Sequence, residues 1–183
     1  MTIRVALIVG SLRQGSFTRA IGLAIKALAA DRLELVPVEI GDLPLYNPDL
    51  EDDAPPAWTR FREAVADTQA VLFATPEYNR SIPGALKNAL DVGSRPYGHS
   101  VWHGKPAAIV SVSPGAIGAF GANHHLRQPL VFLNMPTMQQ PEAYVGNVPG
   151  LLDDDGRLTN EGTRDFLKTF ADAFADWIEK TRG

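Results

Sequence analysis

The stretch LIVGSLRQGSFTRAIGLAI, residues 7–25, joins a strand, a loop and a helix in immediate succession. Its first residues close an apolar, partly β-branched run over residues 4–9, and a glycine ends that run. Further on, apolar side chains recur at the spacing of one helix face, at Phe17, Ile21, Ile25 and Leu28. A strand that passes through a short polar loop into a helix is typical of the opening unit of an α/β fold.

The rest of the chain repeats this alternation of strand and helix. Further strand-like runs cover residues 33–38, 70–74 and 107–112, and a weaker one lies between residues 136 and 144. Helical spacing covers residues 17–30, the surroundings of Trp58, Phe61 and Val65, and residues 83–91, 119–134 and 166–178. The strand-like runs are continuously apolar, which favours a parallel sheet covered on both faces. The sequence therefore predicts an α/β fold with a doubly wound five-stranded parallel sheet, in a single domain spanning residues 1–183.

Composition excludes several classes of function. The 183 residues include no cysteine, which removes disulfide frameworks, thiolate zinc sites and cysteine nucleophiles. A net charge of −4 argues against a nucleic-acid-binding surface. No apolar stretch approaches the roughly 20 residues of a membrane span, and the N-terminal apolar run reads as a first strand rather than a signal peptide. We expect a cytoplasmic protein with neither nucleic acid nor membrane as partner.

The loop in the opening stretch gathers hydrogen-bond donors at the start of a helix. Free N–H groups at a helix N-terminus attract anions, because the positive end of the helix dipole lies behind them. Ser11, Ser16 and Thr18 add hydroxyls, and the planar guanidinium of Arg13 suits phosphate. We expect a terminal monophosphate here. Ordinary capping by Ser16 after a turn at Gly10 is the alternative, but it leaves Arg13 unexplained.

Two well-known nucleotide motifs are absent from this loop. A Walker A loop needs lysine and then serine or threonine after its second glycine, whereas Gly15 is followed by Ser16 and Phe17. The dinucleotide fingerprint G-x-G-x-x-G fails because residue 12 is leucine. The loop therefore does not predict a nucleoside triphosphate hydrolase or a dinucleotide-binding fold.

A second unusual loop, PEYNRSIPGALKNALD at residues 76–91, follows the third strand-like run. Backbone groups freed at a strand end can line the edge of a flat heteroaromatic ring, and Tyr78 can cover such a ring. Asn79 and Ser81 can bond to the ring or cap the next helix. An ordinary strand–turn–helix connection is the alternative. Glu77 could act as a general base, but nothing in the sequence supplies it with a partner.

A third loop, SVSPGAIGAFGANHHLRQPL at residues 111–130, follows the fourth strand-like run. Its glycines at 115, 118 and 121 favour close approach of the backbone to a ligand. Consecutive helical residues do not share a face, so the adjacent His124 and His125 are not expected to bind a metal together. We interpret both, like His99 and His103, as surface or subunit-contact residues.

Together these loops resemble the NADPH-dependent FMN reductase family, which has a flavodoxin-like fold and is related to quinone, chromate and azo-dye reductases. The resemblance rests on G-S-L-R-x-G-S at residues 10–16 and P-E-Y-N-x-S-I-P-G-A-L-K-N-A-L-D at residues 76–91, and it extends from residue 4 to about residue 141. Val92 and Gly93 depart from the family, in which an aromatic residue is frequent after the aspartate. Gly118-Ala119-Phe120 also departs, because relatives often have small residues followed by arginine.

The resemblance implies a bound FMN, with NADPH or NADH as co-substrate, and a homodimer or homotetramer. It implies no catalytic side chain and no metal. The residues implied to hold FMN fall into three groups: Ser11, Arg13, Gln14, Ser16, Phe17 and Thr18 at the phosphate; Pro76, Glu77, Tyr78, Asn79 and Ser81 along the isoalloxazine; and Ser113, Pro114 and Gly115 near the ribityl chain and ring.

The implied activity is hydride transfer from NAD(P)H through FMN to a small-molecule acceptor, a quinone, flavin, chromate or azo compound, by ping-pong kinetics. In such enzymes the flavin carries the chemistry, while the protein supplies placement and electrostatics. One alternative is a non-enzymatic electron carrier of flavodoxin type. Carriers typically have threonine- and glycine-rich phosphate loops and strongly acidic surfaces, so Arg13 and the modest net charge of −4 favour the enzyme. A regulatory protein that binds FMN without turnover is a further alternative.

Overall fold

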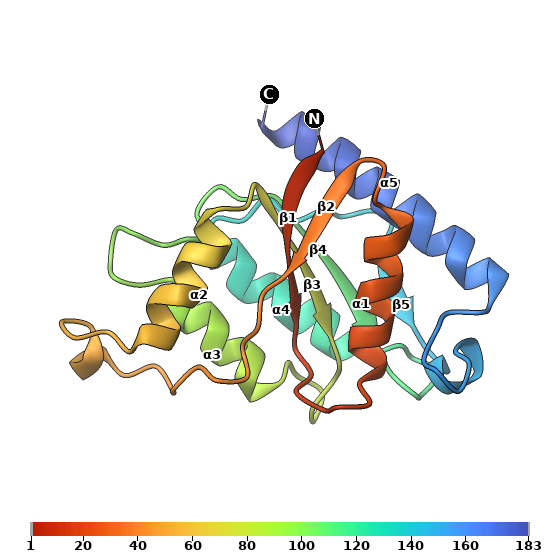
Figure 1. Cartoon of the computed structure of the whole chain (residues 1–183), viewed down its shortest axis with the longest axis horizontal. Helices are drawn as coiled ribbons and strands as arrows, with labels where there is room; N and C mark the ends of the chain where they lie inside the picture. Colours follow the sequence, from red (N-terminus) through yellow and green to blue (C-terminus); the bar gives the residue numbers. More distant parts are fainter. Residues whose placement is uncertain (1, 183) are drawn as a thin grey trace.

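A five-stranded parallel sheet in the order β2-β1-β3-β4-β5 forms the centre of the protein (Figure 1). The computed structural model describes residues 2–182. Its strands are β1 (Ile3–Val9), β2 (Leu33–Pro37), β3 (Ala70–Thr75), β4 (Ala107–Val112) and β5 (Ala143–Val145). Every residue of β3 and β4 is buried, as the continuous apolar runs predict. The predicted flavodoxin-like α/β fold is confirmed.

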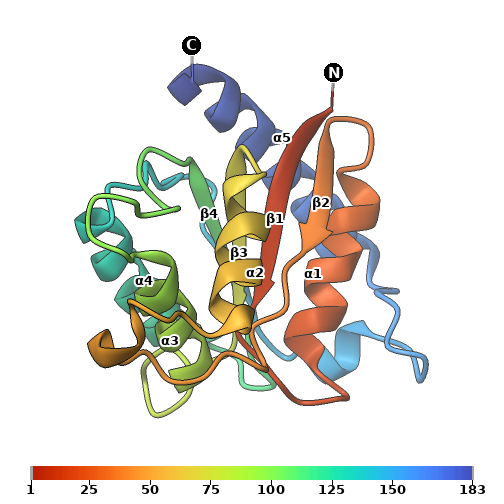
Figure 2. The same cartoon turned by 60° about the vertical axis from the view of Figure 1, so that its left-hand side comes forward.

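Helices cover both faces of the sheet. They are α1 (Phe17–Leu28), α2 (Pro56–Ala66), α3 (Gly84–Gly93), α4 (Phe120–Phe132) and α5 (Glu161–Arg182), with two short 3₁₀ turns at Pro48–Leu50 and Val148–Leu151. Figures 1 and 2 show α1 and α5 on one face and α2, α3 and α4 on the other. None of the helices within residues 2–182 combines the length and the apolar character that crossing a bilayer requires.

Each face of the sheet has its own core. On one face, Ile21 and Ile25 of α1 pack with Phe170 and Phe174 of α5, which confirms the apolar stripes read from the helical spacing. On the other face, two fully buried tryptophans dominate the core, and their rings contact neighbouring aromatic side chains. Both faces of the central strands are thereby covered, and the ends of the strands remain for binding.

The fifth strand begins later than the sequence predicts. The expected segment, between residues 136 and 144, overlaps β5 only at its end. Thr137 forms an isolated bridge with Ala107, and the N–H of Met138 donates to the carbonyl of Ala107 at 2.8 Å. Because proline has no N–H, Pro136 and Pro141 cannot donate to a ladder, and regular pairing starts only after the second of them.

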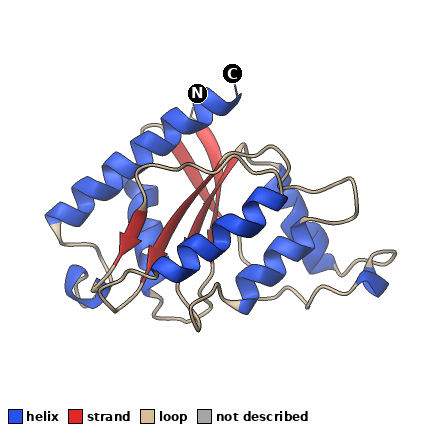
Figure 3. Ribbon diagram, turned by 180° about the vertical axis from the view of Figure 1, so that it is seen from behind, coloured by secondary structure: helices blue, strands red, loops and turns tan. Residues whose placement is uncertain are grey.

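The topology brings three loops to one edge of the sheet. β1, β3 and β4 lie side by side and run in the same direction, so the loops that follow them gather at their carboxyl ends. This edge is at the bottom of Figure 1, and Figure 3 shows it from behind. Ligands of open parallel sheets bind at this edge, where the strand order reverses around β1. The edge is therefore the place to examine the predicted site residues.

Candidate functional site

The loop between β1 and α1 presents a row of unpaired backbone donors. Within the described chain, no N–H group of residues 11–16 donates a hydrogen bond to another protein group. Ser16 is the N-cap of α1, and its Oγ accepts from the N–H of Arg19 at 3.1 Å, so the capping that the sequence offered as the alternative role of Ser16 is present. The row therefore ends at the positive pole of a 12-residue helix, where an anion is stabilised.

Cationic and hydroxyl groups surround this row of donors. The Arg13 guanidinium lies over the Phe17 ring, 5.4 Å from its centroid, and has no carboxylate within 4.0 Å in residues 2–182. Ser11 and Thr18 are both buried, yet their hydroxyls form no hydrogen bond in the described structure. Gln14 is exposed on the loop. An uncommitted guanidinium, free hydroxyls and free N–H groups form a donor set that fits a phosphomonoester.

Gly10 fixes the first loop against the second. Its N–H donates to the Ala74 carbonyl of β3 at 2.8 Å. A Cβ at this position would lie 3.2 Å from Leu86 and 3.4 Å from the ring of Pro76. Because Gly10 has no side chain, the end of β1 lies directly beside the loop after β3. The free N–H groups of residues 11–16 and the segment 76–81 therefore border the same space.

The second loop is a tight hairpin turn that exposes an aromatic side chain. The N–H of Tyr78 donates to Ser81 O at 2.9 Å, and the N–H of Ser81 donates to Tyr78 O at 3.0 Å. Asn79 and Arg80 occupy the two central positions with φ of 52° and 64°, as a type I′ turn requires. Among the residues that the structure describes, the N–H groups of Glu77 and Asn79 have no partner, and Tyr78 is half exposed. A flat ligand would find both hydrogen-bond donors and an aromatic surface here.

The side chains of Glu77 and Ser81 are engaged by α4, a role that the sequence did not reveal. One carboxylate oxygen of Glu77 accepts from the N–H of Ala122 at 3.0 Å, and the other pairs with Arg80 at 2.7 Å. Ser81 Oγ lies 2.6 Å from Nδ1 of His125 and caps no helix. These partners lie 44 and 45 residues away along the chain, which is why sequence spacing could not identify them.

The third loop bonds mainly to itself and to the end of β5. The N–H of Ser113 donates to Val145 O at 3.0 Å, and Gly115 N–H donates to Ser113 Oγ at 3.0 Å. Pro114 and Gly115 are exposed at the edge of the sheet. Gly118 has φ of 62°, and a Cβ there would lie 2.8 Å from the backbone of Tyr144, so the expected close approach is to the protein itself.

The four histidines lie on the surface, as the sequence predicts, and the adjacent pair faces two directions. His125 contacts Ser81, whereas His124 Nε2 lies 2.9 Å from the Tyr144 hydroxyl in a cluster that includes the half-exposed Phe120. Burial, assisted by the Glu142 carboxylate, raises the pKa of Tyr144 to about 12. The phenol therefore stays protonated near neutral pH. No cluster of three potential metal ligands occurs in residues 2–182.

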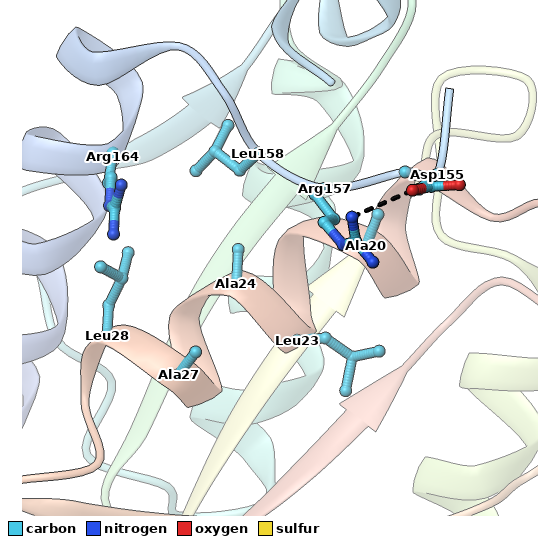
Figure 4. A pocket seen from close by; sticks show the side chains of 10 residues that line it. Ala20, Leu23, Ala24, Ala27, Leu28, Asp155, Arg157, Leu158 and Arg164 are labelled. Carbon is cyan, nitrogen blue, oxygen red and sulfur yellow. Dashed lines mark ion pairs between the residues drawn. The ribbon is translucent and has the colours of Figure 1, made fainter. Parts of the chain in front are cut away.

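Two of the hollows in the described structure differ in their relation to the three loops. One, with a volume of about 410 Å³, lies between α1 and the segment before α5 and is lined by alanines of α1 and by Arg164 (Figure 4). Arg157, which also lines it, pairs with Asp155 at 3.0 Å. None of the predicted site residues lines it. Another, of about 640 Å³, lies between α3 and α4 and includes Ser81 and His125. The second hollow is therefore continuous with the candidate site, and the first is separate from it.

The protein has a doubly wound parallel sheet with free anion-binding groups after its first strand, which defines it as a nucleotide-binding α/β protein. It lacks the motifs of triphosphate hydrolases and of dinucleotide folds. Comparison with known proteins places it within that class. Residues 3–150 match the family described as NADPH-dependent FMN reductase. The chain belongs to this family, and it is an oxidoreductase that uses FMN and NAD(P)H.

Individual relatives agree with this assignment. A quinone reductase of Pseudomonas putida is 62% identical over 179 residues, covering 97% of this chain and 96% of its own. A 2-hydroxy-1,4-benzoquinone reductase of Burkholderia sp. is 44% identical and covers 100% of both chains. The structure of FerB, a flavoenzyme NAD(P)H:(acceptor) oxidoreductase from Paracoccus denitrificans, superposes with a TM-score of 0.93 at 46% identity, covering 98% of this chain and 99% of its own.

Proposed function

We propose that this chain is an NAD(P)H-dependent quinone reductase that holds FMN across the loops after β1, β3 and β4. The observation that carries the proposal is the set of uncommitted donors in residues 11–16, adjacent to the exposed hairpin at Tyr78–Ser81. The names of the relatives at 62% and 44% identity support a quinone as acceptor. Bound FMN would supply the chemistry, because it accepts hydride from NAD(P)H and passes electrons on to the acceptor.

The first loop would bind the phosphate. Its N–H groups and the hydroxyls of Ser11, Ser16 and Thr18 would donate to phosphate oxygens. Ser16 can do so because its cap bond uses one lone pair of the oxygen and leaves the O–H free to donate. Arg13, held over Phe17, adds a planar charged donor from the open side of the loop. Gln14 lies near enough along the loop to assist. These residues bind and orient the cofactor and take no part in electron transfer.

The second and third loops would border the isoalloxazine. The unpaired N–H groups of Glu77 and Asn79 can donate to ring acceptors, and they would stabilise negative charge on the reduced ring. Pro76 and Tyr78 would contact the ring, while Ser113, Pro114 and Gly115 would border it from β4. The Glu77 and Ser81 side chains would contribute indirectly, because both are bonded to α4. One ring face is left open for NAD(P)H and for the acceptor.

We expect steady-state kinetics to show ping-pong behaviour, because one open face would serve both substrates in turn. Oxidation of NADPH and of NADH, followed by absorbance with a benzoquinone as acceptor, should give parallel double-reciprocal lines. Free flavin, chromate and an azo dye should also be reduced, with lower kcat/KM. Intersecting lines would contradict the shared face. A protein that binds no added FMN, or that oxidises NAD(P)H only with a partner protein, would contradict the enzyme and favour the carrier.

We also propose that the enzyme is a homo-oligomer located in the cytoplasm, where NAD(P)H is available. The oligomer is supported by an apolar face on α4, where Val131 is 76% and Phe132 90% exposed. Tyr97 is exposed beside it, and Phe132 lines both the hollow between α3 and α4 and an adjoining one of about 890 Å³. Large exposed apolar side chains at adjoining hollows favour burial against a second copy of the chain.

Phe132→Asp should dissociate this oligomer. A charge at the centre of an apolar interface loses the buried area and adds a desolvation cost, so the molar mass by light scattering should fall to that of a 19.8 kDa monomer. Leu23→Asp is the matched control, because Leu23 is exposed on α1, across the sheet from α4. A wild-type monomer, or an unchanged mass for Phe132→Asp, would contradict the proposed interface.

A further inference from the structure

Glu77 carries a carboxylate that joins the loop after β3 to helix α4 rather than facing solvent. Its side chain is only 12% exposed, whereas that of its ion-pair partner Arg80 is 77% exposed. One oxygen accepts from the Ala122 N–H at 3.0 Å, and the other from Arg80 Nη1 at 2.7 Å. Both oxygens are thus occupied by groups of the protein, which removes Glu77 as a free general base.

The contact with Ala122 supplies a cap that α4 lacks. Ala119, the residue before the helix, has φ of 61° and no side chain able to accept a hydrogen bond. Ala122 is the third helical residue, so its N–H has no partner inside the helix. A carboxylate brought from the loop after β3 satisfies this N–H and complements the helix dipole. The cap is therefore a long-range contact within the chain, since its two residues are 45 positions apart in sequence.

Two further features show that this region is built around the carboxylate. A Cβ at Gly121 would lie 2.9 Å from Glu77 Oε2 and 3.3 Å from the Arg80 carbonyl, so only glycine leaves room for the contact. Four residues after Gly121, His125 bonds to Ser81 at the far end of the same turn. The turn at Tyr78–Ser81 is thereby attached to the first two turns of α4 at both of its ends.

We propose that Glu77 is a positioning residue for the flavin reaction: its carboxylate locks the Tyr78–Ser81 turn onto α4 and so sets where Tyr78 and Asn79 meet the ring. This inference rests on the proposed FMN site. It differs from a ring-contact role for the Glu77 side chain, because the carboxylate acts through the backbone that it holds. The Arg80 pair neutralises the charge, which would otherwise oppose electron transfer to the ring.

Variants of Glu77 distinguish a role in positioning the turn from a direct role of the carboxylate in the reaction. Glu77→Ala removes both contacts, whereas Glu77→Gln keeps an oxygen that can accept from Ala122. With FMN saturating, Glu77→Ala should lower kcat for quinone reduction roughly tenfold or more and alter the visible circular dichroism of the bound flavin. Glu77→Gln should remain close to wild type in both measurements. Glu179→Ala is the control, because Glu179 lies on α5, away from the three loops, and pairs there with Arg32.

Amide hydrogen exchange in the FMN-free protein tests the lock independently of the cofactor. The Ala122 amide should exchange faster in Glu77→Ala and remain protected in Glu77→Gln. Wild-type kcat and dichroism in Glu77→Ala would overturn the proposal. The proposal would also be overturned if the Ala122 amide stayed protected from exchange in Glu77→Gln while kcat fell as far as in Glu77→Ala, because the carboxylate would then act directly. A wild-type protein that binds no FMN would refute the proposed function, and the exchange data would still decide whether the contact holds α4.

Discussion

Arg13→Ala should raise the dissociation constant for FMN about 10- to 100-fold, because hydrogen bonds to a charged group contribute about 1.5–3 kcal/mol. Arg13 has no carboxylate partner in the described structure, and its guanidinium is held over Phe17 rather than in an ion pair. The charge is therefore available to a ligand. Fluorescence titration of the FMN-free protein measures the constant directly.

The same substitution should leave folding unaffected. Because Arg13 makes no ion pair that the fold depends on, the urea midpoint of the FMN-free variant should match that of the wild type. Arg164→Ala, at the separate hollow beside α1, is the control for loss of one positive charge and should keep wild-type FMN affinity. Arg13→Lys should be intermediate, since lysine keeps the charge but lacks the planar fork. Equal losses in Arg13→Ala and Arg164→Ala would point to a non-specific charge effect.

Gly93→Ala should destabilise the FMN-free protein by about 3 kcal/mol, the upper part of the range for overpacking a core. A Cβ at Gly93 would lie 2.5 Å from the indole of Trp102. That indole is fully buried, packs near Phe61 and Phe73, and donates its N–H to Leu90 O at 2.9 Å, so it cannot move aside without losing these contacts. Urea unfolding at equilibrium measures the change.

Gly84→Ala provides the matched comparison within the same helix. A Cβ at Gly84 would meet no atom within 4 Å, so the free energy of unfolding should stay within about 0.5 kcal/mol of the wild-type value. The contrast between two glycines of α3 isolates the contact with Trp102 from the effect of helix propensity. Similar stabilities for the two variants would mean that the Trp102 ring can be displaced at little cost.

Gly93 also shows what the sequence could and could not predict. The motif comparison identified Gly93 as a departure from the family, yet only the structure shows that Trp102 occupies the space above it. The order of strands and helices, the buried stripe of α1 and the cap at Ser16 followed from local spacing, because periodicity and capping are properties of neighbouring residues. The late start of β5 did not, since it depends on how two prolines meet an edge strand.

In the candidate site, too, local features could be predicted from the sequence and long-range contacts could not. The free donors of the loop at residues 10–16 could be predicted because they are consecutive and begin a helix, whereas phosphate binding by this loop stays a prediction. The partners of Glu77 and Ser81 were not, because Ala122 and His125 are brought to them only by the packing of α4 against the loop after β3. Residues that reach the edge of the sheet from different strands can be assigned individual roles only when their long-range contacts are known.

The most direct test of the central claim compares FMN with riboflavin, which differs only in lacking the phosphate. If residues 11–16 hold the phosphate, the wild type should bind FMN far more tightly than riboflavin. Arg13→Ala should reduce that preference by about tenfold or more while leaving the riboflavin dissociation constant unchanged. Equal weakening of both ligands, or an unchanged preference, would contradict the assignment of this loop to the phosphate.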